Sequence, residues 1–352
     1  MAATLKCDTI QNASSTTANL TLDASANATV GGTLAMASSF KRNRLINGNM
    51  YIAQRATSAT VTAGTAVPTA STGYPCLDRW YVYSTGANVT AAQVAGSGSN
   101  KNLLQITGAA SVTAVGVGQR IEQLNSYDLA GQTATLSVNL ANSVLTTVTW
   151  TASYANTADT FGTIGTPTKT QIATGTFTVT STLTQYTTNI SIPAAATTGI
   201  EILFTVGAQT SGTWQIGNVQ LEAGSVATPY ERQIYSDQLA QCQRYLPAIL
   251  AGSFTGDIAV GFTTSSSVGV VTYPFKVTPR TPPTGITVNT VGAFSLTTQA
   301  AASLATTIAL SNAGYDAARL VITGTGTPYV TNNGCILYST ATGSILFTGC
   351  EL

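Results

Sequence analysis

The 352-residue chain contains no histidine, so any acid–base chemistry would have to come mainly from its 13 carboxylates. The absence of histidine removes the Ser-His-Asp and Cys-His mechanisms and every histidine-based metal site. Hydrolysis of a glycosidic bond needs only two carboxyl groups about 5–10 Å apart. Two pairs could converge in this way: Glu122 with Asp128, and Asp78 with Glu222. Both Glu122 and Asp78 have an arginine one or two positions away, so we expect local charge compensation and no enzymatic activity.

Six residues in the last third of the chain are candidates for ligand binding. They form two groups in turn-like sequence: Tyr315, Asp316 and Arg319, then Tyr329, Asn332 and Asn333. Loops at the end of a β-sandwich often carry recognition, and aromatic rings with amides and carboxylates could bind a sugar. The alternative is ordinary turn chemistry. The three tryptophans, Trp80, Trp150 and Trp214, lie in alternating strand patterns, so we expect them in a core rather than on a binding platform.

The composition excludes several classes of protein. Charged residues make up 8% of the chain, against about 25% in a typical soluble protein, and Thr, Ser, Asn, Ala and Gly take their place. The net charge of +1 provides no excess of positive charge that would bind nucleic acid or an anionic membrane. The polar N-terminal sequence argues against a secretory signal. No apolar run approaches the roughly 20 residues that span a bilayer, so we expect no membrane insertion.

The five cysteines are scattered along the chain and show no metal-binding or redox spacing. An odd number of dispersed cysteines argues against a disulfide scaffold. We therefore expect the cysteines to be buried in the core as small hydrophobic side chains. Cys335 and Cys350 are the one pair worth checking for a bond.

Strict alternation of apolar and hydroxyl residues dominates the region from 44 to 232 and predicts half-buried antiparallel strands. The segment Ala134 to Leu140 is typical of this pattern. Gly116-Val117-Gly118 leads into a strand, so we interpret it as strand punctuation and not as a phosphate loop. Around Gly217-Asn218 the alternation changes phase, which predicts a β-bulge.

One short helix is predicted between two β regions. Ser236 could cap it and Pro247 ends it. One apolar stripe runs along it: Tyr235, Leu239, Cys242 and Leu246. We therefore expect an all-β protein with an extended N-terminal segment (residues 1–40), a central β-sandwich (41–232), a linker helix (233–247) and a small C-terminal β-sandwich (248–352).

Residues 1–40 contain few large apolar side chains. Burial of so few side chains does not offset the conformational entropy of ordering 40 residues. We therefore expect this segment to be disordered or to be ordered by other chains, and a homotrimer with the three segments intertwined is the assembly we predict.

Several motifs, taken in order, resemble a known family. They include Arg44-Leu45-Ile46-Asn47-Gly48-Asn49-Met50, Leu77-Asp78-Arg79-Trp80, Gln119-Arg120-Ile121-Glu122-Gln123, and Gln220 to Arg232 with the helix that follows. Together they cover roughly residues 44 to 245 and resemble the jelly-roll domain, similar to carbohydrate-binding modules, of bacteriophage fibre proteins. This resemblance implies a central jelly roll. Such modules often hold a structural calcium ion, for which Asp78 and Glu222 could supply oxygen ligands; no other cofactor is expected.

The resemblance implies a virion protein that is assembled in the host cytoplasm. We expect a tail fibre that attaches to the host-cell surface, through recognition of a glycan, with residues 1–40 joining it to other virion structural proteins. A head fibre or decoration protein on the capsid or collar, without a specific ligand, is the alternative. A polysaccharide depolymerase is the least favoured, because the chain lacks the long repeating coils of the familiar phage depolymerases.

Overall fold

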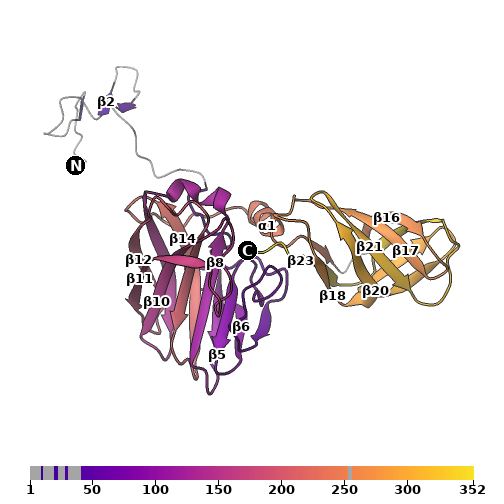
Figure 1. Ribbon diagram of the computed structural model, residues 1–352, viewed down its shortest axis with the longest axis horizontal. Helices are drawn as coiled ribbons and strands as arrows, with labels where there is room; N and C mark the ends of the chain where they lie inside the picture. Colours follow the sequence, from indigo (N-terminus) through magenta and orange to yellow (C-terminus); the bar gives the residue numbers. More distant parts are fainter. Residues whose placement is uncertain (1–8, 11–19, 23–27, 31–40, 253–255) are drawn as a thin grey trace, which may run out of the picture. The chain divides into compact units, whose positions relative to one another are not determined.

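The computed structural model describes residues 9–10, 20–22, 28–30, 41–252 and 256–352 (Figure 1). The chain divides into two units, Met1–Arg42 and Asn43–Leu352. In the first unit three short strands pair antiparallel: β1 (Thr9–Ile10), β2 (Leu20–Leu22) and β3 (Ala28–Val30). The expected intertwining of residues 1–40 falls mostly outside the described residues and stays a prediction.

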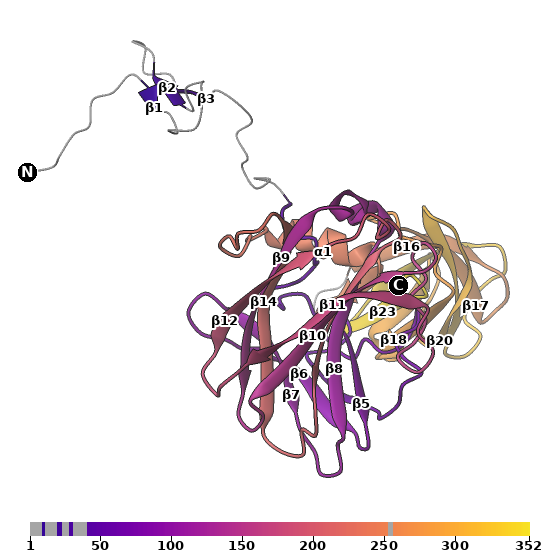
Figure 2. The ribbon, with the colours of Figure 1, turned by 60° about the vertical axis from the view of Figure 1, so that its left-hand side comes forward.

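Two antiparallel sheets form the jelly-roll region, as Figure 2 shows. The five-stranded sheet has the order β11 (Lys169–Thr178), β10 (Thr147–Ala155), β13 (Ile200–Val206), β8 (Ala114–Ile121) and β5 (Tyr81–Thr85). The six-stranded sheet has the order β12 (Thr184–Ser191), β9 (Thr133–Asn142), β14 (Thr213–Ala223), β7 (Asn102–Thr107), β6 (Val89–Ala95) and β4 (Ser58–Val61). Two one-turn 3-10 helices, η1 (Gln123–Asn125) and η2 (Tyr127–Leu129), connect β8 to β9.

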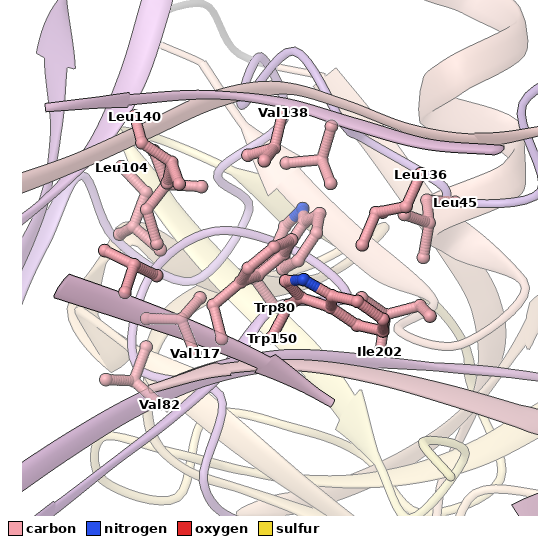
Figure 3. Close-up of a cluster of buried hydrophobic side chains, with 14 of the residues drawn as sticks. Leu45, Trp80, Val82, Leu104, Val117, Leu136, Val138, Leu140, Trp150 and Ile202 are labelled. Carbon is pink, nitrogen blue, oxygen red and sulfur yellow. The ribbon is translucent and has the colours of Figure 1, made fainter. Parts of the chain in front are cut away.

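The core lies between the inward faces of these sheets. Leu136, Val138 and Leu140 on β9 approach Val117 on β8 and Ile202 on β13 (Figure 3). All five side chains are fully buried, and the residues between them on β9 are polar. The period-two pattern of the sequence is therefore the pattern of one apolar face turned inward.

The three tryptophans confirm the core prediction. Trp80, Trp150 and Trp214 are 1%, 6% and 0% exposed. The indole Nε1 of Trp80 donates a hydrogen bond to the carbonyl oxygen of Asn47 at 2.9 Å. None of the three rings is available to stack on a ligand.

The predicted bulge in β14 is also confirmed. The pairing of β14 with β9 shifts its register between Gly217 and Gln220, and Asn218 has a φ of 44°. The bulge keeps Trp214 and Ile216 in the core on one side of it and Val219 and Leu221 on the other.

Gly116 and Gly118 on β8 provide space for two tyrosine rings. They pair with Tyr83 and Tyr81 on β5, and a Cβ atom would lie 2.1 Å from the ring of Tyr83 or 2.3 Å from the Tyr81 hydroxyl oxygen. The rings pack with Tyr74 under the loops at residues 64–74 and 161–168. These loops cover the outward face of the five-stranded sheet along β5 and β8.

Helix α1 (Tyr235–Gln243) confirms the single predicted helix, although its details differ from the prediction. Its N-cap is Ile234, with no side-chain cap, so the assignment of that role to Ser236 was wrong. Cys242 and Leu246 are buried, Leu239 is half-buried and Tyr235 is 54% exposed. The stripe is thus buried at its C-terminal end only.

The C-terminal region is all β, as predicted. A closed barrel has the strand order β16 (Gly256–Thr263), β17 (Val268–Pro274), β21 (Ala317–Gly324), β20 (Ala302–Ala313), β19 (Phe294–Thr298) and β22 (Gly334–Ser339). A separate sheet has the order β15 (Ala248–Ala251), β23 (Gly343–Thr348) and β18 (Gly285–Asn289), and η3 (Val291–Ala293) precedes β19. Apolar and polar residues alternate in the same way along the strands of a barrel and of a sandwich. The sequence pattern therefore could not show that six of these strands close into a barrel.

The cysteines that the structure describes confirm their predicted character. Cys76, Cys242, Cys335 and Cys350 are free and buried. The thiol of Cys350 donates to the carbonyl oxygen of Thr281 at 3.1 Å, whereas Cys335 packs in the barrel core, so these two are not bonded to each other. Cys7 lies outside the described residues. In the described part of the chain, no helix is long and apolar enough to cross a membrane.

Candidate functional site

The structure separates the two predicted ligand-binding groups in the barrel. Tyr315 and Asp316 are exposed in the hairpin between β20 and β21, and Arg319 is exposed on β21. Asn332 and Asn333 follow the other end of β21. That strand has 8 residues and therefore separates the groups by about 23 Å.

Tyr329 belongs to the barrel core. It is 4% exposed, and its hydroxyl donates to the carbonyl oxygen of Leu296 at 3.1 Å. A ring enclosed in this way cannot stack on a sugar. Asn332 has a φ of 67°, and its backbone N–H donates to the carbonyl oxygen of Thr263 at 2.8 Å, which is turn chemistry. The second predicted group is therefore structural.

The carboxylates proposed as calcium ligands are each held by their own protein donors. Asp78 is fully buried and accepts hydrogen bonds from the backbone and side-chain N–H groups of Gln54. Glu222 accepts from Thr228 and from Gln220. They share no partner, and the described residues contain no cluster of three His, Cys, Asp or Glu side chains that could hold a metal ion.

Burial raises the pKa of Asp78 to about 6, against the attraction of Arg55. A raised pKa is typical of a general acid, but the Asp78 side chain is enclosed and meets no solvent. It therefore has no access to a substrate in this structure.

The carboxylates of the other candidate pair, Glu122 and Asp128, are paired with arginines that are distant in the sequence. Glu122 accepts from Arg244 at 2.7 Å and from the Tyr245 hydroxyl at 3.0 Å. Burial opposes its ionisation, but the hydrogen bonds from Arg244 prevail and hold the pKa of Glu122 below its ordinary value. Asp128 pairs with Arg44 at 2.6 Å. We predicted that an arginine two positions away compensates the charge of Glu122. That prediction was wrong, because the partner of Glu122 is Arg244.

A pocket of about 220 Å³ lies where helix α1 meets the turn between β6 and β7. Its lining is aromatic and polar: Asn49, Tyr51, Ser99, Lys101, Asn218, Tyr230, Arg232, Gln233, Tyr235 and Gln238. The rings of Tyr51 and Tyr235 meet edge to face with centroids 5.5 Å apart. Tyr235 keeps 54% of its surface exposed. The pocket thus offers an accessible aromatic ring among amide groups.

A second pocket, of about 540 Å³, adjoins the first. The two share four residues in their lining: Ser99, Asn218, Tyr230 and Arg232. We call the two pockets together the sheet groove. In the second pocket Asn139 on β9 and Gln185 on β12 are register partners and lie on the outward face of the six-stranded sheet.

The sheet groove contains no carboxylate in its lining. Each of its two cations is held by a separate contact. Lys101 Nζ lies 5.4 Å from the centroid of the Tyr51 ring and 3.3 Å from its hydroxyl oxygen. Arg232 Nη2 donates to the carbonyl oxygen of Ser99 at 2.6 Å. The Oδ1 atom of Asn49 is buried at the wall and accepts no hydrogen bond within the described structure.

Sequence reasoning missed the sheet groove because its walls come from six distant segments. Residues 49–51, 99–101, 139, 185, 218 and 227–238 meet only after the sandwich has formed. The only available signal was the local aromatic and amide content around Tyr230 to Gln238, which lies inside one of the resembling motifs.

The sequence matches no protein-family model and none of the curated proteins. Among solved structures, the chain is similar to a family 4 carbohydrate-binding module, with 14% identity and a TM-score of 0.34 over 51% of this chain and 98% of that one. It is similar to a suggested sugar-binding protein from Bacteroides thetaiotaomicron, with 13% identity and a TM-score of 0.33 over 52% of this chain and 100% of that one.

The enzymatically active domain of tailspike protein 4 from bacteriophage CBA120 shares 18% identity at a TM-score of 0.31. The match covers 46% of this chain and 21% of that one. Similarities this low transfer no function, so the function has to follow from the sheet groove itself.

Proposed function

We propose that this chain is a non-enzymatic attachment protein of a phage virion, and that it binds a surface glycan in the sheet groove. The observation that carries the glycan site is the groove on the outward face of the six-stranded sheet, in which exposed Tyr235 stands among amide side chains. Ligand sites of this kind combine an apolar surface with a few convergent polar groups.

The chemistry of the sheet groove fits a saccharide. An aromatic ring provides a flat apolar surface with a polar end, which suits the C–H face of a sugar ring. The amides of Asn139 and Gln185 each offer two donors and an acceptor to hydroxyl groups, and Asn49 Oδ1 is an acceptor without a donor. The second pocket, of about 540 Å³, reaches residues on two neighbouring strands, which favours an oligosaccharide over a single sugar.

The virion part of the proposal is supported by the sequence motifs and by the composition. A surface rich in threonine, serine and asparagine and poor in charge is typical of extracellular β fibres. We propose that three chains associate through residues 1–40, which also join the tail, and that assembly takes place in the host cytoplasm. Labelling of this protein on intact particles separates a tail fibre from a head fibre, because the label then marks the tail or the capsid.

The glycan site can be tested with two tyrosines of equal exposure. Tyr235 in the sheet groove and Tyr315 in the β20–β21 hairpin are 54% and 53% exposed. We expect Tyr235→Ala to lower adsorption to host cells and binding on a glycan array at least about tenfold, as the loss of a central aromatic contact does. Tyr315→Ala is the matched control. Loss of binding with Tyr315→Ala alone would move the site to the barrel.

The non-enzymatic character is tested on the same ligand. We expect no release of reducing ends when the full chain is incubated with host-cell polysaccharide, because the candidate acids are held by arginine, glutamine and threonine partners. Sustained turnover that is abolished by Glu122→Gln or Asp78→Asn would contradict the proposal.

A further inference from the structure

Two exposed cations lie together in the lining of the sheet groove. Only 14 lysines and arginines occur in 352 residues. Six of them form the seven ion pairs in the described structure: Arg44, Arg55, Arg79, Arg120, Lys169 and Arg244. Lys101 and Arg232 are exposed, line the same pocket, and belong to none of these pairs.

Two acids close to the sheet groove, Glu231 and Glu222, are engaged by other contacts. Glu231 Oε2 accepts a hydrogen bond from the backbone N–H of Asn43 at 2.9 Å. Both carboxylate oxygens of Glu222 are occupied by Thr228, at 2.8 Å from its backbone N–H and 2.6 Å from its hydroxyl. No carboxylate lines either pocket, so no acidic group of the lining compensates the positive charge there.

Both cations are held in place yet keep unused donors. Lys101 Nζ makes one hydrogen bond, to the Tyr51 hydroxyl at 3.3 Å, and has two N–H groups left. Arg232 uses Nη2 for the carbonyl oxygen of Ser99, which leaves the rest of its planar fork free. A guanidinium fork matches the two oxygens of a carboxylate in a bidentate contact.

We infer that the sheet groove selects an acidic saccharide, one that carries a carboxylate, over its neutral counterpart. This inference rests on the proposed function. The sugar rings contact Tyr235 and the amides, and the carboxylate lies between Lys101 and Arg232. A neutral glycan gains nothing from the two cations, so they act as determinants of specificity rather than of general affinity.

The test uses the full chain and oligosaccharides in matched acidic and neutral pairs. Suitable probes are oligogalacturonates with their methyl esters, and sialylated oligosaccharides with their desialylated forms. Titration calorimetry should show at least about tenfold tighter binding of the acidic member of one pair, as expected for a charge-assisted contact. That preference should fall as NaCl rises from about 50 to 300 mM, because salt screens exposed charges.

Four variants locate the effect. Lys101→Gln and Arg232→Gln should each weaken binding of the acidic probe about tenfold and so remove most of its preference over the neutral probe. Arg232→Lys should retain the preference in part, since it keeps the charge but loses the planar fork. Lys276→Gln, the same substitution at an exposed lysine in the segment between β17 and β18, should change neither probe.

The outcomes separate this inference from the proposed function. Equal binding of acidic and neutral probes, with both lost in Tyr235→Ala, would overturn the acidic preference and leave the glycan site standing. An acidic preference that persists unchanged in Lys101→Gln and Arg232→Gln would overturn the placement of the carboxylate. Tighter binding of a phosphorylated than of a carboxylated oligosaccharide would overturn the assignment to carboxylates. Absence of binding to every probe and to a broad glycan array would refute the glycan site itself.

Discussion

Replacement of Glu351 by glutamine should be among the most destabilising single changes in the described chain. Its carboxylate is 1% exposed and contacts Arg79, which is equally buried, and Arg55 at 3.1 Å. The Arg79 guanidinium lies 3.6 Å from the ring centroid of Tyr245 and donates to the carbonyl oxygen of Arg120 at 2.6 Å. Glutamine has the same shape but no charge, so it leaves a buried guanidinium without its counter-ion.

The magnitude follows from burial. Loss of one partner of a buried ion pair costs about 3–5 kcal/mol, whereas an exposed pair is worth about 0–1 kcal/mol. Asp128→Asn is the matched control, because it removes the pair with Arg44, in which the side chains are 44% and 23% exposed. We expect Glu351→Gln to lower the free energy of unfolding by about 3–5 kcal/mol and Asp128→Asn by under about 1 kcal/mol.

Urea unfolding followed by tryptophan fluorescence measures both values, because all three tryptophans are buried in the jelly-roll core. A double-mutant cycle with Arg79→Met isolates the pair and should give a coupling energy of about 0.5–3 kcal/mol. A loss in Glu351→Gln no larger than that in Asp128→Asn would refute the reasoning, since it would mean that residue 351 does not stabilise the jelly roll.

Three further predictions follow from burial and from the expected assembly. Leu246→Ala should lower the free energy of unfolding by about 2–5 kcal/mol, and Leu239→Ala by clearly less. The reason is that Leu246 is 1% exposed whereas Leu239 is half-buried. Equal melting temperatures of the two variants would contradict this ranking. Burial raises the pKa of Asp78 from 3.8 to about 6, so the folded protein favours the protonated carboxyl group more than the unfolded chain does. This contribution to stability is fully present below about pH 4 and is lost as the pH rises through 6. The difference in unfolding free energy between the wild type and Asp78→Asn should therefore change over that window and be flat above pH 7. Mass measurement in solution should give a homotrimer for the full chain and weaker association after deletion of residues 1–40; a stable dimer would refute the threefold symmetry.

Local patterns in the sequence were sufficient to predict the strands and the helix, but not which distant residues contact one another. Alternation placed Trp150 and the strand from Ala134 to Leu140 in the core, and a phase change located the bulge beside Asn218. These features depend on residues within a few positions of each other. The all-β class and the short helix follow from the same short-range information.

Long-range contacts could not be predicted from the sequence alone. Arg79 was expected to compensate Asp78, its neighbour, but its partner is Glu351, which is 272 positions away. Asp78 and Arg79 lie in a turn, in which Arg79 has a φ of 72°, and Asp78 is held by Gln54 while Arg79 contacts Glu351. Proximity in sequence is therefore a poor guide to ion pairing there. The sheet groove, with walls from six segments, and the buried position of Tyr329 likewise depend on contacts between distant residues and became visible only in the fold.

The distribution of charge connects the stability of the fold with the proposed recognition. Five of the seven ion pairs have both side chains at most 13% exposed, so most paired charge lies inside, around Glu351 and Glu201. Amides and hydroxyls predominate on the outward face of the six-stranded sheet, where the Glu222 carboxylate is buried against Thr228, and loops cover the outward face of β5 and β8. On a surface with so little charge, an exposed cation is not cancelled by neighbours of opposite sign. Under the proposed function, Lys101 and Arg232 act on a ligand with little competition from the lining, and the selectivity of the sheet groove should depend on those two side chains.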